Sequence, residues 1–412
     1  LAMQTLTPCV ADSGRWVEQA RSAHADGAVV VDWVTSRRNS AADLADGPGS
    51  ERVQVTNWAA DVMAAAVTLY IGDMCVSRSA AEDGWTRHIR LSLPLLPTSP
   101  VRKTLGRATE ALAFVSGDRI EIEATECSRP YVFEVDPLAR DGVDAVCLFS
   151  GGVDSLLGAA RLLERGLRLC LVAHYADSRT AATHDWLRIR LAELFPGQVD
   201  YRPCYVSRGG TRGTPHFPLR EKSERSHRVR SFLFLSAAAL YADLYGVDTI
   251  FVPENGVIAL NIPLDTTRAG SRSTRTAHPY FLPLMADFLS SARGTALRIC
   301  NPFGLSSKTE LVSSAPKWTH ELLRDSLSCA KYDTLRWSGA GPERHCGYCL
   351  PCIYRRLAFD SAGLDPLEGH YACDAFAELP QLSHTKGQDL RSLAFFLKRY
   401  SQSDEATRRA MM

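Results

Sequence analysis

Hydrophobic and polar positions follow a different pattern before and after residue 140. In the later part, continuous apolar runs typical of buried parallel strands alternate with apolar-rich helical segments. We expect strands at 143–149, 167–174, 199–206, 249–253 and 296–300. We expect helices at 156–164, 183–194, 229–245 and 282–292. This alternation predicts an α/β fold with a doubly wound parallel sheet.

The region before residue 140 mixes helical and alternating patterns and contains no recognisable catalytic cluster. Strands are expected at 28–33, 86–93, 119–124 and 131–135, and helices at 57–72 and 105–115. The polar segment 37–49 contains Pro-Gly and predicts a loop. We interpret residues 1–140 as an α+β domain. This domain could be a scaffold or a dimer surface. The function we prefer is a docking platform for a partner or acceptor.

The sharpest motif is SGGVDS, where the expected first strand of the parallel sheet meets its helix. Its residues are Ser150, Gly151, Gly152, Val153, Asp154 and Ser155. Two glycines allow a tight turn whose N–H groups can bind one anion, and the helix N-terminus adds partial positive charge. Asp154 could hold Mg²⁺ or cap the helix. The motif lacks the lysine of GxxxxGK[ST] loops. The alternative is an ordinary strand-to-helix turn.

Three further residues are candidates for the same edge of the sheet. Lys308, in SKTEL, could bind phosphate as a point charge, or it could be a solvated lysine at a helix start. Glu254 and Asn255 follow an expected strand, so they could contact substrate or Mg²⁺, or simply form a turn.

Four cysteines near the C-terminus have the spacing C-x16-C-x2-C-x2-C. They are Cys329, Cys346, Cys349 and Cys352. Four thiolates close a tetrahedral structural zinc site, and an iron–sulfur cluster is the chemical alternative. Gly347 allows the tight turn between two of these cysteines. With no open coordination position, the zinc would not be catalytic.

Composition narrows the class of protein. The chain has 412 residues, of which 45% are hydrophobic and 23% charged, which excludes a disordered chain. A net charge of +1 gives no global basic field for nucleic acid, although segment 202–230 is rich in arginine and could close over phosphates or touch RNA. We expect no membrane span and no signal peptide. Twelve cysteines, scattered except for the C-terminal cluster, are too few for a disulfide scaffold, so we expect a reducing cytoplasm.

Two stretches carry a resemblance to a known family. SGGVDS resembles the PP-loop of the N-type ATP pyrophosphatases, and SLSC…HCGYCLPCIYRRLAFDSAGLDP resembles the C-terminal end of the 7-cyano-7-deazaguanine synthase (QueC) family. Segment 230–238, RSFLFLSAA, resembles that family's RNxxFLSxA helix. The resemblance covers about residues 143–365. It implies a PP-loop ATP-binding domain at 141–325 and a four-cysteine zinc module with C-terminal helices at 326–412.

The resemblance also implies site residues and a reaction. Residues 150–155 would bind ATP phosphates, His174 and Tyr175 would contact adenine, and Arg230 would lie near the nucleotide or the substrate carboxylate. The family's reaction adenylates 7-carboxy-7-deazaguanine, releases pyrophosphate, forms an amide and dehydrates it to a nitrile. The chain would thus be a ligase that forms a C–N bond, with ATP, Mg²⁺ and Zn²⁺ as cofactors.

The sequence departs from the family's motifs at several positions, and these differences suggest that the activated carboxyl group is passed to an acceptor other than ammonia. Ser231 replaces the family's asparagine, its DYxxYPDCR-like segment has no clear counterpart, and the first 140 residues are additional. QueC-like proteins with such extensions resemble QatC-type components of bacterial anti-phage operons. We therefore expect transfer to an amine of a partner protein, such as its N-terminus. The alternatives are nitrile synthesis from ammonia, a tRNA-modifying PP-loop enzyme and a non-catalytic nucleotide sensor. Assembly into an oligomer stays open.

Overall fold

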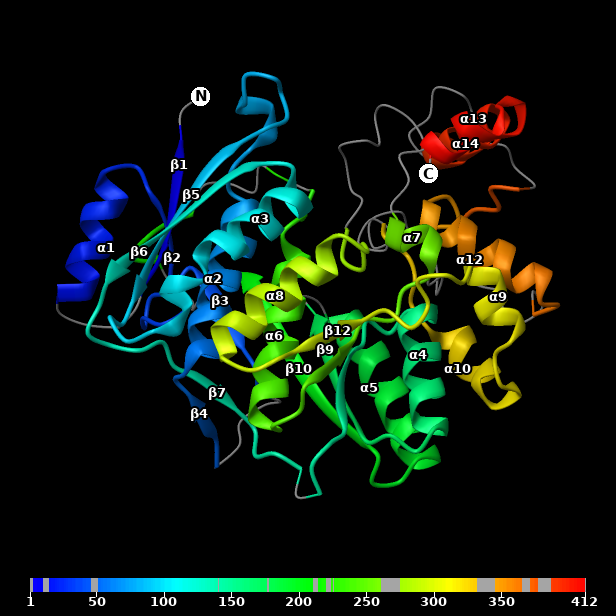
Figure 1. The fold of residues 1–412 in the computed structure, drawn as a ribbon, viewed down its shortest axis with the longest axis horizontal. Helices are drawn as coiled ribbons and strands as arrows, with labels where there is room; N and C mark the ends of the chain where they lie inside the picture. The colour runs from blue at the N-terminus through cyan, green and yellow to red at the C-terminus, as the bar shows by residue number, and fades with distance from the viewer. Residues whose placement is uncertain are drawn as a thin grey trace.

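The computed structural model describes residues 3–9, 15–45, 51–139, 141–175, 178–209, 214–219, 224, 226–260, 275–331, 345–364, 371–376 and 387–411. Part of the basic segment 202–230 therefore lies outside the described residues. The N-terminal region lies on one side of the larger, six-stranded sheet, and helices α13 (Gln388–Gln402) and α14 (Glu405–Met411) lie on the other (Figure 1).

The larger sheet has six strands in the order β12-β11-β8-β9-β10-β3. Their bounds are β8 Ala145–Leu148, β9 Leu169–Tyr175, β10 Val199–Arg208, β11 Thr249–Phe251, β12 Arg298–Cys300 and β3 Ser40–Asp43. The first five pair in parallel, as predicted. Strand order reverses between β8 and β11, so the segments that follow these two strands meet at a topological switch point, where such sheets bind ligands.

Helices cover both faces of this sheet. Phe149, which directly follows β8, and Cys147 share a core with α4 (Val153–Glu164) and α5 (Ser178–Leu194). Their neighbours Val146 and Leu148 share the other core with α6 (Arg230–Leu244) and α8 (Phe281–Arg293). Alternate residues of a strand point to opposite faces, and each face here buries apolar side chains. The doubly wound arrangement predicted from the sequence is therefore present.

The N-terminal sheet corrects the expected α+β arrangement. Its order is β2-β1-β5-β6, and all three pairings are parallel. The bounds are β1 Gln4–Pro8, β2 Val29–Val31, β5 His88–Leu95 and β6 Arg119–Glu126. Parallel neighbours need crossover connections. Helix α1 (Arg15–Ala25) joins β1 to β2, and α3 (Leu105–Ser116) joins β5 to β6. The sheet therefore contains two strand–helix–strand units, β1-α1-β2 and β5-α3-β6. The sequence patterns predicted neither β1 nor α1, so the first of these units was not recognised.

The loop predicted at 37–49 is also corrected, because it contains β3. This strand pairs antiparallel with β10 along Ser40–Asp43 and so extends the larger sheet. Its sequence, SAAD, offers no alternation of large apolar side chains, and its partner is far away in the chain. Strand β7 (Phe133–Val135) pairs antiparallel with β4 (Val53–Val55) in a small second ladder.

Helix α2 (Trp58–Asp73) joins the two sheets. Asn57 caps its N-terminus by accepting a hydrogen bond from the N–H of Ala59, and every residue of the helix is buried. A helix that is apolar all round belongs inside a core. Its side chains share one hydrophobic cluster with β5 of the N-terminal sheet and with α6 beside the larger sheet. The predicted region 1–140 is thus packed into the core of the region that follows it.

The remaining described helices are short or lie near the C-terminus. They are α7 Gly256–Leu260, α9 Lys308–Ser313, α10 His320–Asp325 and α12 Leu350–Ser361, with 3₁₀ turns at Arg78–Ala80, Pro100–Lys103 and Lys317–Thr319. Within the described ranges, no helix combines the length and apolar character needed to cross a membrane.

Candidate active site

The SGGVDS loop leads from β8 into α4 at the carboxyl edge of the larger sheet. Gly151 has a φ of +70°, and a Cβ there would lie 2.8 Å from His184 Cδ2, so a side chain would be strained and crowded. Two serine hydroxyls brace the turn. The N–H of Ser150 donates to Ser155 Oγ at 3.2 Å, and that of Gly152 donates to Ser150 Oγ at 3.4 Å. The result is a compact cradle at a helix N-terminus, which is suited to an anion.

A polar cluster lies immediately beside this loop. Lys308 Nζ lies 2.5 Å from Asp154 Oδ1. Asn255 donates to the other oxygen, Asp154 Oδ2, from its side-chain amide at 2.7 Å and from its backbone N–H at 3.3 Å. The side chains of Lys308 and Asp154 are only 10% and 6% exposed, so Lys308 is not a solvated lysine. The switch point thus joins Asp154, Asn255 and Lys308, three residues singled out from separate parts of the sequence.

The pKa values of the neighbouring carboxyl groups of Asp154 and Glu254 are shifted in opposite directions. Burial raises the pKa of Glu254 well above its usual value, and the neighbouring Asp154 carboxylate raises it further. Burial alone would raise the pKa of Asp154 as well, but Lys308 and a hydrogen bond with Glu254 lower it to about 2. These surroundings favour the ionised form of Asp154 and the protonated form of Glu254. Two carboxyl groups at one place also form an oxygen donor set of the kind that Mg²⁺ prefers.

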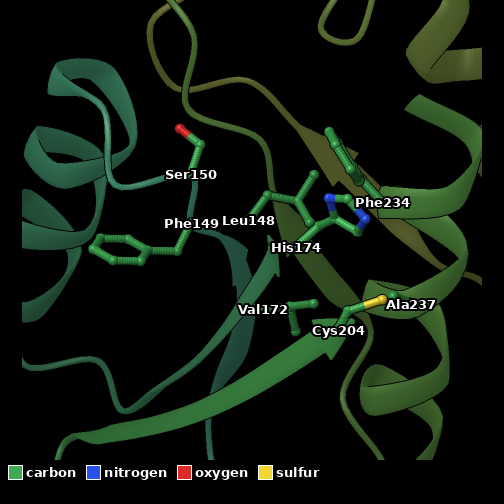
Figure 2. A pocket seen from close by; sticks show the side chains of 8 residues that line it. All are labelled: Leu148, Phe149, Ser150, Val172, His174, Cys204, Phe234 and Ala237. Atoms are coloured by element: carbon green, nitrogen blue, oxygen red, sulfur yellow. The ribbon is translucent and has the colours of Figure 1, made fainter. Parts of the chain in front are cut away.

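A pocket opens next to the loop (Figure 2). It offers about 360 Å³ of empty space, including its open mouth. Its walls come from β8, β9, β10 and α6 together with the loop: Leu148, Phe149, Ser150, Val172, His174, Cys204, Phe234 and Ala237. Leu148 and His174 point toward Phe234, whereas Phe149 points to the other face of the sheet (Figure 2). Its lining is mostly apolar, which suits the face of an aromatic ring better than a charged group.

His174 forms part of this wall as a neutral ring. Its Nε2 lies 3.4 Å from the carbonyl oxygen of Val206, and its ring lies 5.2 Å from Phe234 and 5.5 Å from Tyr70. Burial lowers the pKa of His174 to about 4. The adjacent Tyr175 does not line the pocket; its ring lies 5.3 Å from that of Tyr205. Of the two residues expected near a base, the structure brings only His174 to the pocket.

Arg230 begins α6 at the same edge of the sheet. Burial lowers the pKa of its guanidinium, and its electrostatic neighbours are Tyr70 and Glu254. Tyr70 belongs to α2, in the region where no site residue was expected. A lone tyrosine in an apolar helix carries no sequence signal, so only the packing of α2 shows that it lies near the pocket.

The four cysteines converge as their spacing predicts. Their Sγ atoms all lie within 4.8 Å of one another, with Cys349 and Cys352 at 3.3 Å and Cys346 and Cys352 at 3.9 Å. Gly347 has a φ of +80°, and a Cβ there would collide with the carbonyl oxygen of Cys373. Zn–S bonds of about 2.3 Å place tetrahedral sulfur atoms roughly 3.8 Å apart. The set could therefore hold a metal such as zinc, with no position left for a substrate.

Curated relatives match about half of the chain. A 7-cyano-7-deazaguanine synthase 2 of Sulfurisphaera tokodaii is 27% identical over 235 residues, and a 7-cyano-7-deazaguanine synthase of Saccharolobus solfataricus is 26% identical over 233 residues. Each match covers 53% of this chain and 46% of the relative, so the chain spans about half the length of these two proteins. A synthase of the same name from Novosphingobium aromaticivorans is 27% identical over 55% of this chain and 94% of its own length.

These similarities support a QueC-like chain, in agreement with the resemblance seen in the sequence. No protein-family model matches the chain. Among solved structures, a ketoreductase domain from the bacillaene assembly line aligns at 12% identity over 73% of this chain and 80% of that domain. Its TM-score of 0.24 is too low to carry an argument about the fold.

Proposed function

We propose that this chain uses ATP to adenylate a 7-carboxy-7-deazaguanine-like acid, releases pyrophosphate, and passes the activated carboxyl group to an amine. The observation that carries this proposal is the meeting of the SGGVDS loop, through its Asp154, with Asn255 and Lys308 beside a mostly apolar pocket. The relatives that bear the name 7-cyano-7-deazaguanine synthase support a deazaguanine as substrate.

Each group has a task in this reaction. Loop N–H groups and the ammonium of Lys308 would stabilise the negative charge that builds on the departing pyrophosphate. The Asp154 carboxylate would hold Mg²⁺, which screens phosphate charge when bound, and Glu254 could join it as a ligand only on losing its proton. The wall with His174 and Phe234 would accept a purine face, and Arg230 would attract a carboxylate. The four cysteines would bind structural zinc.

We further propose that the acceptor is a protein amine, such as the N-terminus of a partner in an anti-phage system. The match to the Novosphingobium relative uses 94% of that protein but only 55% of this chain, so much of this chain has no counterpart there. The region before residue 140 could present such an acceptor, because α2 brings it to the edge of the pocket.

The test combines the purified chain with ATP, Mg²⁺, 7-carboxy-7-deazaguanine and a partner protein encoded beside it. We expect release of pyrophosphate and AMP that depends on the acid, together with a matching mass gain on the partner's N-terminal peptide. A partner whose N-terminal amine is acetylated is the control and should gain no mass. If pyrophosphate does not form with any carboxylate, the adenylation proposal is wrong.

A second candidate function is nitrile synthesis from ammonia, which the names of the relatives favour. In the same assay without a partner, ammonium would then yield 7-cyano-7-deazaguanine. Two other functions give different results. Iron with acid-labile sulfide in anaerobically purified protein would favour a tRNA-thiolating enzyme, and nucleotide binding without turnover would favour a sensor.

A further inference from the structure

The segment before the first cysteine of the cluster lies directly on the SGGVDS loop. The N–H of Leu327 donates to the carbonyl oxygen of Gly151 at 2.8 Å. The N–H of Val153 donates to Ser328 Oγ at 3.3 Å. These bonds join residues far apart in sequence, and they engage the backbone that would cradle phosphate. The metal module is therefore part of the loop's immediate surroundings.

The hydroxyl of Ser328 can also donate a hydrogen bond. A serine hydroxyl has one proton and two acceptor positions. One acceptor position is used by the N–H of Val153, and no described residue accepts the proton of Ser328. Ser328 is half-buried as a residue, so the protein does not enclose it on every side. A phosphate oxygen at the N-terminus of α4 would meet both the loop amides and this hydroxyl.

Ser328 is held in place from both ends of its segment. Upstream, the fully buried Arg355 of α12 donates to the carbonyl oxygens of Leu323 at 2.6 Å and Ser326 at 3.2 Å. Downstream, the N–H of Ser328 donates to His345 Nε2 at 3.4 Å, and the N–H of Cys346 donates to Cys329 Sγ at 3.4 Å. Each of these anchors belongs to the cysteine cluster, directly precedes one of its cysteines, or lies in the helix that follows it.

We propose that Ser328 is a phosphate-binding residue supplied by the metal module, so that metal in the four-cysteine site sets the affinity of the loop for pyrophosphate. This inference rests on the proposed function, since it assumes that the loop binds pyrophosphate. The cluster then has a functional effect without touching substrate, because losing the metal would release the segment that positions Ser328.

The first test measures binding of inorganic pyrophosphate with Mg²⁺ by calorimetry. Ser328→Ala should bind about 10- to 100-fold more weakly than the unaltered chain, the loss expected for one hydrogen bond to a charged group. Ser328→Cys, with its weak S–H donor, should show a similar loss, and Ser328→Thr should restore binding. Ser314→Ala is the matched control, because this exposed serine bonds Arg161 away from the loop.

The second test removes the metal with a chelator and follows metal content by mass spectrometry alongside pyrophosphate affinity. We expect affinity to fall in proportion to the metal lost and to return on adding Zn²⁺, with faster amide hydrogen exchange in the 150–155 peptide of the metal-free chain. If Ser328→Ala loses metal or does not fold, Ser328→Cys at full metal content decides the role of the hydroxyl.

The outcomes separate the two proposals. If the unaltered, metal-loaded chain does not bind pyrophosphate or ATP, the proposed function is overturned and this inference with it. If it binds, but Ser328→Ala and Ser328→Cys bind equally well, or metal removal leaves the affinity unchanged, the inference alone is overturned.

Discussion

Lys308 has the most direct electrostatic role among the residues of the candidate site. Its side chain is almost wholly buried and pairs with Asp154, while Asn255 holds the other carboxylate oxygen. A buried pair is costly to break, because the remaining charge is left without compensation. The pair therefore fixes the position of Asp154 as well as supplying positive charge.

We expect Lys308→Met to abolish most pyrophosphate release, with a loss of at least about 100-fold, typical for one stabilising group in a preorganised site. The free energy of unfolding should fall by about 3 kcal/mol or less, since Asp154 can take up a proton. Pyrophosphate assays and urea unfolding measure the two effects. Lys317→Met alters an exposed lysine and is the control. Equal activities of the two variants would contradict the role of Lys308.

His174 predicts a dependence of stability on pH. Its pKa is lowered to about 4 because burial disfavours the imidazolium, whereas the unfolded chain has a His pKa of about 6.5. Between these values the unfolded state binds more protons, so the free energy of unfolding falls as pH drops from about 6.5 to 4. The loss is at most about 3 kcal/mol. His174→Gln should remove this part of the slope in urea unfolding series. An unchanged slope would show that other groups cause it.

Local motifs made several site residues predictable. The SGGVDS loop and the cysteine spacing are short motifs whose residue types indicate anion binding and metal binding. Glu254 and Asn255 were singled out because they directly follow an expected strand. Tyr70 and Ser328 were missed for a physical reason. Each reaches the site only because a distant element packs there. Tyr70 has no neighbour in sequence that reveals it, and although Ser328 directly precedes Cys329, the cysteine spacing says nothing about contact with the loop.

At the scale of elements, the cysteine cluster fixes the start of α12. The helix begins directly after Cys349, and its Arg355 holds the segment that follows α10. Metal binding to a site that the unfolded chain lacks contributes directly to folding free energy. The stability of this part of the chain should therefore depend on the cluster.

We expect Cys349→Ser to lower metal content and to reduce the free energy of unfolding by several kcal/mol. Cys300→Ser changes an exposed cysteine outside the cluster and should do neither. Elemental analysis and thermal unfolding, with and without added Zn²⁺, provide the measurements. A Cys349→Ser protein with normal metal content and stability would show that the cluster does not bind the ion.

The elements of the parallel sheet were predicted well because buried strands are continuous apolar runs between helices. The strands β1 and β3 were not, since short segments such as SAAD have no pattern of their own. β3 is a strand because β10 offers it a ladder. Such pairing depends on tertiary structure and overrides local propensity.

On the scale of the whole molecule, α2 links the N-terminal region to the pocket. Tyr70 packs its ring against His174, on which Phe234 also packs. Burial also raises the pKa of the Tyr70 hydroxyl to about 12, so it stays protonated. The region before residue 140 thus supports the wall of the candidate site directly.

We expect Tyr70→Ala to raise the KM for ATP about tenfold while kcat falls less, because the wall of the base pocket loses support. Tyr70→Phe keeps the ring and should behave like the unaltered chain. Steady-state kinetics separate these effects. A fall in kcat with unchanged KM, or an equal defect in Tyr70→Phe, would contradict a role through ring packing.

The antiparallel strand β3 has a consequence for how the chain could be divided. It pairs with the backbone of β10 from Tyr205 to Arg208. In a protein starting at residue 141, this edge of β10 would have no partner strand, while its other edge would still pair with β9. Bare ladders of this kind recruit strands from other molecules. We expect such a fragment, which also exposes the apolar surface that α2 covers, to self-associate with rising concentration in sedimentation experiments, and a peptide carrying Ser40–Asp43 to reduce the part of this association that uses the β10 edge. The N-terminal region would then protect the larger sheet from aggregation by covering its edge strand.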